Sequence, residues 1–308
     1  MFKNKLILRW LQITQFLIIT STEDKASMNI RDKFLNKFQF EETKLKWHEN
    51  DLLKLEFKSQ NAVSLENVQV NLGLTDEPLI YLNDLKLEQS DINPDLLIFA
   101  SRHRSEAARP AFLIHTTGNW TDTAEFGGNP RELCFASALL LKAGFLSLLE
   151  QEKSSKLSGF SLDIEVTHHG PTTLEKPLVF MELGSSEEEW IINEAGEIVA
   201  KSIINTVFKY LQFQTEKSQK ICIGFGGTHY GPQFKKSLMT KDVAFSFICP
   251  KYFIQELDYK MIEQMINKNL EEIDCFVIDW KGTNSADKNH LIPLLEGFDI
   301  PIKKTKEL

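Results

Sequence analysis

Four histidines stand where runs of strand-forming residues end close to glycine. They are His115, His168, His169 and His229, and the whole chain of 308 residues contains only 7 histidines. Histidine changes its charge near neutral pH and is the commonest protein ligand of metal ions. A group of histidines at neighbouring strand ends is therefore suited either to general acid–base catalysis or to metal binding.

The adjacent pair His168-His169 follows the alternating run Ser161–Val166. Successive side chains of a strand point to opposite faces, so continued alternation puts His168 with Ile164 on an apolar face. By the same alternation, His169 shares the polar face with Glu165. Both imidazoles can point the same way only if the strand has already ended at Thr167.

Three explanations of the histidine group stay open on spacing alone. Neutral imidazoles with a carboxylate from Glu165, Glu182 or Asp122 could bind zinc, although no H-E-x-x-H or Cys/His ligand spacing is present. One histidine, held in a single tautomer by a neighbouring carboxylate or by Asn119, could act as a general acid or base. The third explanation is hydrogen bonding for structure alone. It is preferred above all for His48, His103 and His290.

Weaker patterns concern phosphate binding. The segment Gly224–Thr228 could hold a phosphate with backbone N–H groups, but it lacks the third glycine of a dinucleotide fingerprint and the Lys-Ser/Thr of a P-loop. Several cations could contact phosphates, although a solvated surface is the default for each of them. These residues are Arg102, Arg104, Arg109, Lys235, Lys236 and Lys241. Gly-x-Ser-x-Gly is absent, which disfavours an ordinary serine esterase.

Strands and helices alternate along most of the chain, which is typical of a three-layer α/β/α fold with a mixed, largely parallel sheet. We predict strands at residues 16–20, 52–57, 68–72, 79–82, 95–101, 112–115, 160–168, 177–183, 221–225, 243–249 and 275–280. We predict helices near 30–38, 131–150, 186–213, 256–268 and 286–296, the first capped by Ser27 or Asn29 and the second by Asn129. If the strands before the histidines are parallel neighbours, the histidines meet beyond the carboxyl ends of the sheet.

Composition limits the remaining possibilities. The formal net charge of −8 argues against a broad nucleic-acid surface, so an RNA substrate would be held by a few clustered cations. The four cysteines form no C-x-x-C pair and predict buried free thiols in a reducing compartment, here the cytoplasm. Residues 1–15 are too polar for a membrane span and predict an extension ahead of a single domain covering 16–308.

Five separated segments resemble the D-aminoacyl-tRNA deacylase family of the archaeal and plant type. They are Ser21–Ile30, Ser101–His103, His115–Trp120, Thr167–Thr172 and Gly226–Pro232, in the order and with the spacing of the family. The resemblance runs from about Phe16 to the C-terminus. Where the family often has Gly-Gly-Gly-His-Tyr, this chain has Thr228 before His229.

This resemblance implies hydrolysis of the ester between a D-amino acid and the 3′-terminal ribose of tRNA, which releases the D-amino acid and reusable tRNA. It also implies zinc as a cofactor and a phosphorylase/hydrolase-like α/β/α fold similar to that of peptidyl-tRNA hydrolase. Neither a membrane nor a protein partner is implied. We therefore expect a monomer whose partner is its substrate, D-aminoacyl-tRNA.

Roles for single residues follow as hypotheses within that resemblance. The catalytic residues expected are His168, His169, Glu165, His115 and His229. One histidine of the adjacent pair activates water, directly or through zinc, while Glu165 or Glu182 orients that histidine or shares the metal. His115, His229 and the N–H groups near Gly226–Gly227 bind the substrate or the oxyanion. The metal ligands expected are His168, His169, Glu182 and His229. The substrate-binding residues expected are Thr116, Asn119, Gly226, Gly227, Tyr230, Arg102 and Arg104.

Two other functions stay open. A zinc hydrolase of similar fold that acts on another acyl ester or amide would cleave small substrates and be indifferent to added tRNA. A non-catalytic RNA-binding protein would bind uncharged tRNA with strong salt dependence and leave D-aminoacyl-tRNA intact. The acidic charge balance makes the RNA-binding protein the poorer fit.

Overall fold

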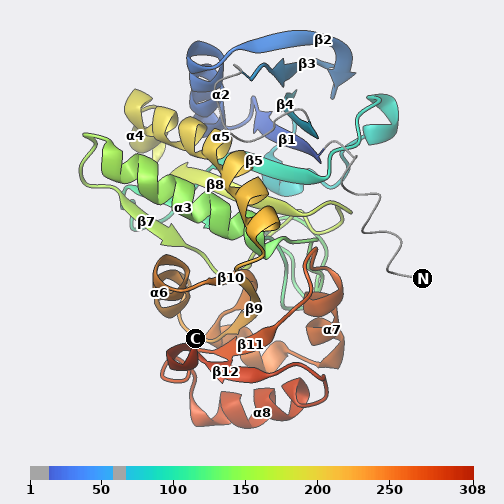
Figure 1. The fold of residues 1–308 in the computed structure, drawn as a ribbon, viewed down its shortest axis with the longest axis vertical. Helices are drawn as coiled ribbons and strands as arrows, with labels where there is room; N and C mark the ends of the chain where they lie inside the picture. Colours follow the sequence, from blue (N-terminus) through green and yellow to red (C-terminus); the bar gives the residue numbers. More distant parts are fainter. Residues whose placement is uncertain (1–13, 58–66) are drawn as a thin grey trace.

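The chain folds into a larger and a smaller β-sheet with helices between and around them, as Figure 1 shows for the computed structural model. The structure describes residues 14–57 and 67–308. Most of the predicted N-terminal extension, residues 1–13, lies outside the described residues, whereas Thr14 and Gln15 belong to the first strand. No helix in the described part of the chain is long and apolar enough to cross a membrane.

Eight strands of the described chain form the larger sheet, in the order β2-β3-β4-β1-β5-β8-β6-β7. Their bounds are β1 Thr14–Ser21, β2 Phe40–Trp47, β3 Asn50–Leu55, β4 Val68–Thr75, β5 Leu96–Arg102, β6 Ala111–His115, β7 Ser161–Ile164 and β8 Leu178–Gly184. β4, β1, β5 and β8 run parallel, as do β6 and β7. β6 is antiparallel to β8, and β3 is antiparallel to β2 and β4. The predicted α/β class with a mixed, largely parallel sheet is confirmed.

The smaller sheet lies at the lower end of Figure 1 and is wholly parallel. Its order is β10-β9-β11-β12, with β9 Lys220–Phe225, β10 Val243–Cys249, β11 Cys275–Ile278 and β12 Ile302–Lys304. The sequence pattern predicts β9, β10 and β11, but it does not reveal that they form a sheet of their own. Three-residue β12, which has no buried residue, escapes the prediction because its pattern is too short.

The helices pack on both sheets and separate them. Their bounds are α2 Lys25–Lys37, α3 Ala138–Ser154, α4 Glu187–Trp190, α5 Asn193–Glu216, α6 Pro232–Thr240, α7 Tyr259–Asn267 and α8 Ser285–Leu295. α2, α3 and α5 cover one face of the larger sheet, while α7 and α8 cover the outer face of the smaller one (Figure 1). The opposite face of the larger sheet packs against Trp47 and the loop that follows β4.

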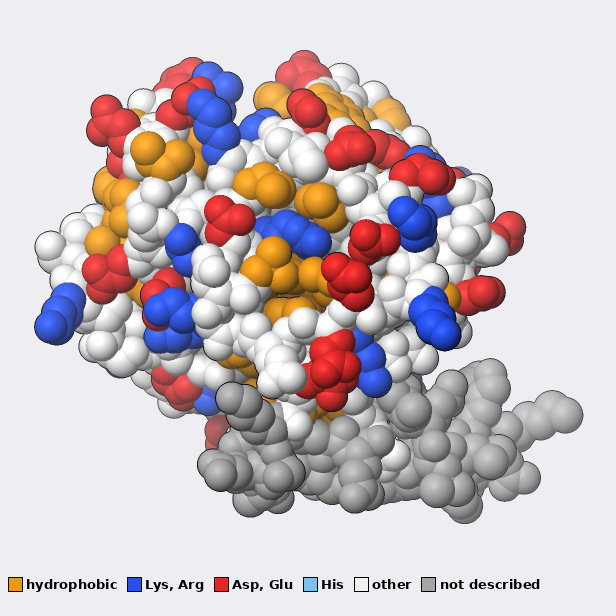
Figure 2. Space-filling view, turned by 90° about the horizontal axis from the view of Figure 1, so that it is seen from above, with side chains coloured by type: hydrophobic (Ala, Val, Ile, Leu, Met, Phe, Trp, Pro, Cys, Tyr) orange, Lys and Arg blue, Asp and Glu red, His pale blue; other side chains and the backbone are white. Residues whose placement is uncertain are grey.

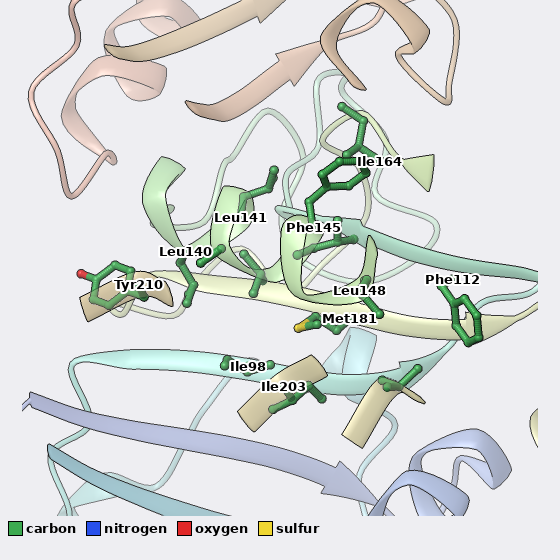
Figure 3. Packing of buried hydrophobic residues seen from close by; sticks show 14 of the residues in the cluster. Ile98, Phe112, Leu140, Leu141, Phe145, Leu148, Ile164, Met181, Ile203 and Tyr210 are labelled. Atoms are coloured by element: carbon green, nitrogen blue, oxygen red, sulfur yellow. The ribbon is translucent and has the colours of Figure 1, made fainter. Parts of the chain in front are cut away.

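Helix α3 organises the main core. Leu140, Phe145 and Leu148 of α3 gather with Met181 of β8 and Ile203 of α5 in one buried cluster, shown from close by in Figure 3. The same cluster takes in apolar residues of β9 and β10, so α3 holds the two sheets together. All four cysteines are buried free thiols, as predicted.

One predicted strand is instead a turn of 3-10 helix. Residues Leu79–Tyr81 form that helix after Pro78, and both Leu79 and Leu82 are buried. Two apolar residues three positions apart fit one side of a 3-10 turn, whereas strand alternation would put them on opposite faces. The strand prediction for 79–82 is therefore wrong.

Helix α3 begins later than its start signals predict. Ser137 is the N-cap, and its hydroxyl accepts from the N–H of Leu140. Asn129 does not start the helix because the following residues pair with the loop after β6: Leu133 bridges to Gly118, and the N–H of Cys134 donates to Thr117. These non-local backbone hydrogen bonds outweigh the local capping pattern of Asn129, Pro130 and Glu132, which matches the sequence rule for a helix start.

Two other helix starts also differ from the prediction. Asp24, rather than Ser27 or Asn29, caps α2 by accepting from the N–H of Ser27. Ser186 forms the expected capping box with Glu189, but that helix ends at Trp190, and the long α5 begins separately at Asn193.

Strand β7 ends at Ile164, four residues before His168. The N–H of Glu165 still donates to Ile114 of β6, but the next N–H groups bond elsewhere. Val166 donates to the carbonyl of His229, and Thr167 donates to Ile248 of β10. The chain thus leaves the larger sheet for the smaller one, so the predicted alternation through His168 and His169 is wrong.

The position of the α3 cap gives a testable difference in stability. Ser137→Ala should lower the free energy of unfolding by about 1–2 kcal/mol, because the N–H of Leu140 loses its acceptor and the carboxylate of Glu271 loses a donor. Asn129→Ala, at the position that the sequence pattern favours, should cost less than about 0.5 kcal/mol. Urea unfolding of both variants measures this, and a larger loss for Asn129→Ala would contradict the assigned cap.

Candidate active site

One face of the larger sheet changes from apolar to polar along β5, β8 and β6. Phe99 stacks on Phe180 with 4.9 Å between ring centroids, and Phe180 stacks on His115 at 5.3 Å. Strand alternation places Glu182 on the same face as Phe180. Nε2 of His115 lies 3.6 Å from Oε1 of Glu182. The sheet itself therefore sets a buried imidazole beside a buried carboxylate.

The adjacent histidines join His115 at this point. The ring of His115 is 4.3 Å from that of His168 and 4.7 Å from that of His169, between centroids. His169 has a φ of 42°, and the N–H of Gly118 donates to its carbonyl. The chain turns sharply here, and the turn brings both imidazoles to the same site.

Backbone carbonyls orient the three imidazoles. Nδ1 of His115, His168 and His169 donates to the carbonyls of Thr116, Val166 and Gly170 at 3.1, 2.8 and 2.7 Å. Each ring then keeps the lone pair of Nε2 free, which is the usual arrangement of histidines that bind metal. Nε2 of His115 is buried without a hydrogen-bond partner. This orphaned nitrogen fits a bound cation.

Two buried carboxylates connect this group to further histidines. Nε2 of His229 donates to Oε1 of Glu165 at 2.8 Å. Nδ1 of His103 lies 3.2 Å from Oε2 of Glu182 and 3.5 Å from Oε2 of Glu165. Five of the chain's seven histidines and these two glutamates thus form one cluster, which we call the His–Glu cluster. Its members are His103, His115, Glu165, His168, His169, Glu182 and His229.

Within the His–Glu cluster, the two glutamates and His103 favour their charged forms. Burial disfavours ionisation, yet the nearby imidazole of His103 and the hydrogen bond from His229 hold the pKa of Glu165 well below its usual value. The pKa of Glu182 is lowered in the same way by His103 and His115. Although burial opposes it, the adjoining carboxylates of Glu165 and Glu182 raise the pKa of His103 to about 10. His103 is therefore an imidazolium between two carboxylates.

The adjacent histidines, His168 and His169, favour their neutral forms instead. Burial and the nearby His115 lower the pKa of His169 to about 4 and hold that of His168 well below 6.5. Both are neutral near pH 7, as ligands of a metal ion have to be. Burial opposes protonation of His115, but Glu182 raises its pKa, so a cation binding there would displace a proton.

Three overlapping groups in the described chain bring enough ligand atoms together for a metal ion. They are His115 with His168 and His169, Glu165 with His168 and His229, and His103 with Glu165 and Glu182. Within each group the ligand atoms lie within 4.8 Å of one another. Only the first consists of imidazoles alone, each with its ring fixed by a backbone carbonyl, and it best suits zinc, which favours nitrogen ligands.

His229 forms the open end of the cluster. Its side chain is 37% exposed, whereas that of Glu165 is fully buried. Nδ1 of His229 lies 3.2 Å from the hydroxyl of Tyr252, which is itself exposed. A substrate can therefore meet an imidazole that a buried carboxylate orients from behind.

Comparison with known proteins shows the family to which the chain belongs. A family model described as D-aminoacyl-tRNA deacylase matches residues 90–303. The chain belongs to the D-aminoacyl-tRNA deacylase family. The D-aminoacyl-tRNA deacylase of Pyrococcus furiosus is 36% identical over 275 residues, which cover 88% of this chain and 93% of the relative. That of Methanocaldococcus jannaschii is 36% identical over 290 residues, which cover 93% and 98%.

A solved structure agrees with the fold of this deacylase-family chain. The crystal structure of a conserved protein of unknown function is 31% identical and superposes with a TM-score of 0.80. The match covers 96% of this chain and 97% of the other. The family membership and the fold class expected from the sequence are thus both confirmed.

The structure brings together all the catalytic candidates of the sequence and arranges the proposed metal ligands differently. His168 and His169 lie with His115, while His229 pairs with Glu165, and Glu182 contacts His103. The set of His168, His169, Glu182 and His229 is therefore not one of the three groups found among the described residues.

Several substrate-binding candidates have structural partners instead. The hydroxyl of Thr116 donates to the carbonyl of Ser246, and the amide of Asn119 donates to Gly127. The N–H of Gly226 donates to Cys249, and that of Gly227 donates to Gly282. These two N–H groups already have acceptors, so they do not form a free oxyanion site.

The remaining candidates lie nearer the surface. Arg102 donates to the carbonyl of Glu23 and lies 5.4 Å from the ring centroid of Trp190, whereas Arg104 is exposed. Tyr230 is 38% exposed and lies next to His229, with 5.3 Å between ring centroids. Of these residues, Tyr230 is the one in contact with the cluster.

Sequence reasoning missed two residues of the site. His103 was assigned to structural hydrogen bonding, yet it bridges both carboxylates. Its position directly after the buried strand β5, within the family-like segment Ser101–His103, was the available signal. Tyr252 follows β10 in the same way, but no pattern near it indicated a contact with His229.

The imidazolium of His103 predicts how stability depends on pH. Because its pKa rises on folding, its contribution is fully present below pH 6.5 and is lost as the pH rises through about 10. The free energy of unfolding should therefore fall more steeply between these pH values for the unmodified protein than for His103→Gln. Urea unfolding in the presence of a chelator measures both slopes, and equal slopes would contradict a charged His103.

Proposed function

We propose that this chain hydrolyses the ester of D-aminoacyl-tRNA and releases free D-amino acid and tRNA. The observation that carries the proposal is the His–Glu cluster, found in a chain that matches D-aminoacyl-tRNA deacylases along nearly its whole length. Ester hydrolysis needs an activated water, a stabilised oxyanion and a proton for the leaving ribose oxygen. The cluster offers the imidazole of His229 for the two proton transfers.

His229 moves protons at the open end of the cluster. The carboxylate of Glu165 accepts its Nε2–H, which leaves Nδ1 as the acceptor that faces Tyr252 and solvent. An imidazole fixed in one tautomer by a buried carboxylate is suited to take a proton from water and return it to the ribose oxygen. His103, charged and between two carboxylates, keeps Glu165 in place without contacting the substrate.

The resident metal is the second part of the proposal. His115, His168 and His169 would hold a zinc ion through Nε2, which leaves Glu165 and His229 paired with each other. A bound zinc ion supplies Lewis acidity and lowers the pKa of a bound water. The backbone carbonyls that accept from Nδ1 of each ring fix the ligands in advance.

Selection of the D-amino acid and the cellular setting complete the proposal. An L side chain would be rejected by a clash rather than by weaker attraction, because the two enantiomers offer the same groups. We expect a cytoplasmic monomer that forms one domain from β1, which begins at Thr14, to residue 308, with tRNA as its macromolecular partner.

Substitution of the adjacent histidines tests this function. His168→Ala and His169→Ala, made one at a time, should each lower D-aminoacyl-tRNA deacylation by about a hundredfold or more. A chelator should do the same to the unmodified protein and remove zinc measured by mass spectrometry. His290→Ala is the control, since His290 donates to Leu257 away from the cluster. Near-normal turnover of both adjacent-histidine variants would contradict the assignment.

A further inference from the structure

The smaller sheet presents four strand ends at one edge, because all its strands are parallel. Ligands of open α/β sheets bind beyond the carboxyl ends of such strands. The loop after β9 leads to His229, the 3-10 helix Lys251–Glu256 after β10 contains Tyr252, and the loop after β11 contains Trp280. This edge therefore continues directly from the open end of the His–Glu cluster.

Close backbone contacts make these loops one surface. The carbonyl of Gly227 accepts from the N–H of Lys251 at 3.0 Å, and the N–H of Gly227 donates to Gly282 at 3.4 Å. Gly226 has a φ of 97°, and the Cβ of any other residue at this position would collide with the hydroxyl of Thr283. The two glycines thus serve close loop packing, which fixes Trp280 relative to His229.

Exposed aromatic rings stand on this surface. Tyr252 is 50% exposed while its hydroxyl touches His229, and Trp280 is 37% exposed. Nζ of Lys288 and of Lys304 lie 4.6 and 4.5 Å from the centroid of the Trp280 ring. Proteins that bind single-stranded nucleic acid commonly combine solvent-facing aromatic rings, on which bases stack, with cations that contact the phosphates.

The local charge is opposite to that of the whole chain. Lys251 and Lys281 are exposed beside the two rings, in a protein whose net charge is −8. The nearby Asp279 is buried and accepts from the N–H of Gly282, while Glu307 lies 3.7 Å from Lys304. By contrast, Figure 2 shows the end of the molecule over α2, β2 and β3, where basic and acidic side chains intermingle.

We propose that this edge binds the single-stranded 3′ end of tRNA, an inference that rests on the proposed function. We call it the 3′-end surface, and it consists of Lys251, Tyr252, Trp280, Lys281, Lys288 and Lys304. The terminal base stacks on Tyr252, which brings the ester at its ribose to His229. Trp280 and the lysines hold the preceding nucleotides and their phosphates, which position the strand without reading its sequence.

Two variants test the surface separately from the chemistry. Trp280→Ala, and Lys281→Ala with Lys288→Ala, should each weaken binding of uncharged tRNA and raise KM for D-aminoacyl-tRNA by about tenfold. The double variant should also reduce the slope of log affinity against log salt by about 1.4, for two lost phosphate contacts. Hydrolysis of a short substrate, the D-alanyl ester of adenosine, should stay within about twofold of normal, because these residues lie outside the cluster.

The control replaces two exposed lysines of β2, as Lys44→Ala with Lys46→Ala. The proposal that this surface binds tRNA would be overturned if the 3′-end variants bound tRNA normally, or if the control lost as much tRNA affinity as they do. An equal loss on the short ester would also overturn it, since the variants would then disturb the chemistry. If the unmodified protein binds tRNA through this surface but cleaves no D-aminoacyl ester, the proposed function fails and the surface stands.

Discussion

The carboxylate of Glu165 joins the two halves of this protein. One oxygen accepts from His229, which follows a strand of the smaller sheet, and the other faces His103 at the end of a strand of the larger sheet. Its own N–H remains bonded to Ile114, while the next residues bond to the smaller sheet. Burial of a carboxylate is tolerated only when partners compensate for lost hydration. The histidines are those partners, so the fold and the site depend on the same contact.

This dependence has a cost in stability. Two ionised carboxylates and a charged imidazole lie almost fully buried, and Nε2 of both His103 and His115 has no hydrogen-bond partner. Replacing such a group by apolar residues often stabilises a protein, whereas removing one partner costs about 3–5 kcal/mol. Burying this cluster destabilises the fold, and backbone carbonyls orient its imidazoles. A catalytic role therefore explains the cluster better than a contribution to stability does.

The sequence predicted the ends of most strands and therefore the histidines at them. Apolar runs such as Leu96–Ala100 and Leu178–Leu183 are local signals, and the sheet follows from them. The meeting of His229 with Glu165 could not be predicted, because it joins two sheets through residues 64 positions apart. The same holds for the start of α3, where bonds to Thr117 and Gly118 outweigh a good capping pattern. Local patterns thus identified the groups, whereas non-local contacts decided their arrangement.

The most direct test of this account is the rate of D-amino acid release from D-aminoacyl-tRNA by Glu165→Gln. Glutamine keeps the shape of the side chain but removes the charge that holds His229 in one tautomer and pairs with His103. The rate should fall by about a hundredfold or more, while circular dichroism shows the chain still folded. An unchanged rate in the folded variant would contradict the central role of Glu165.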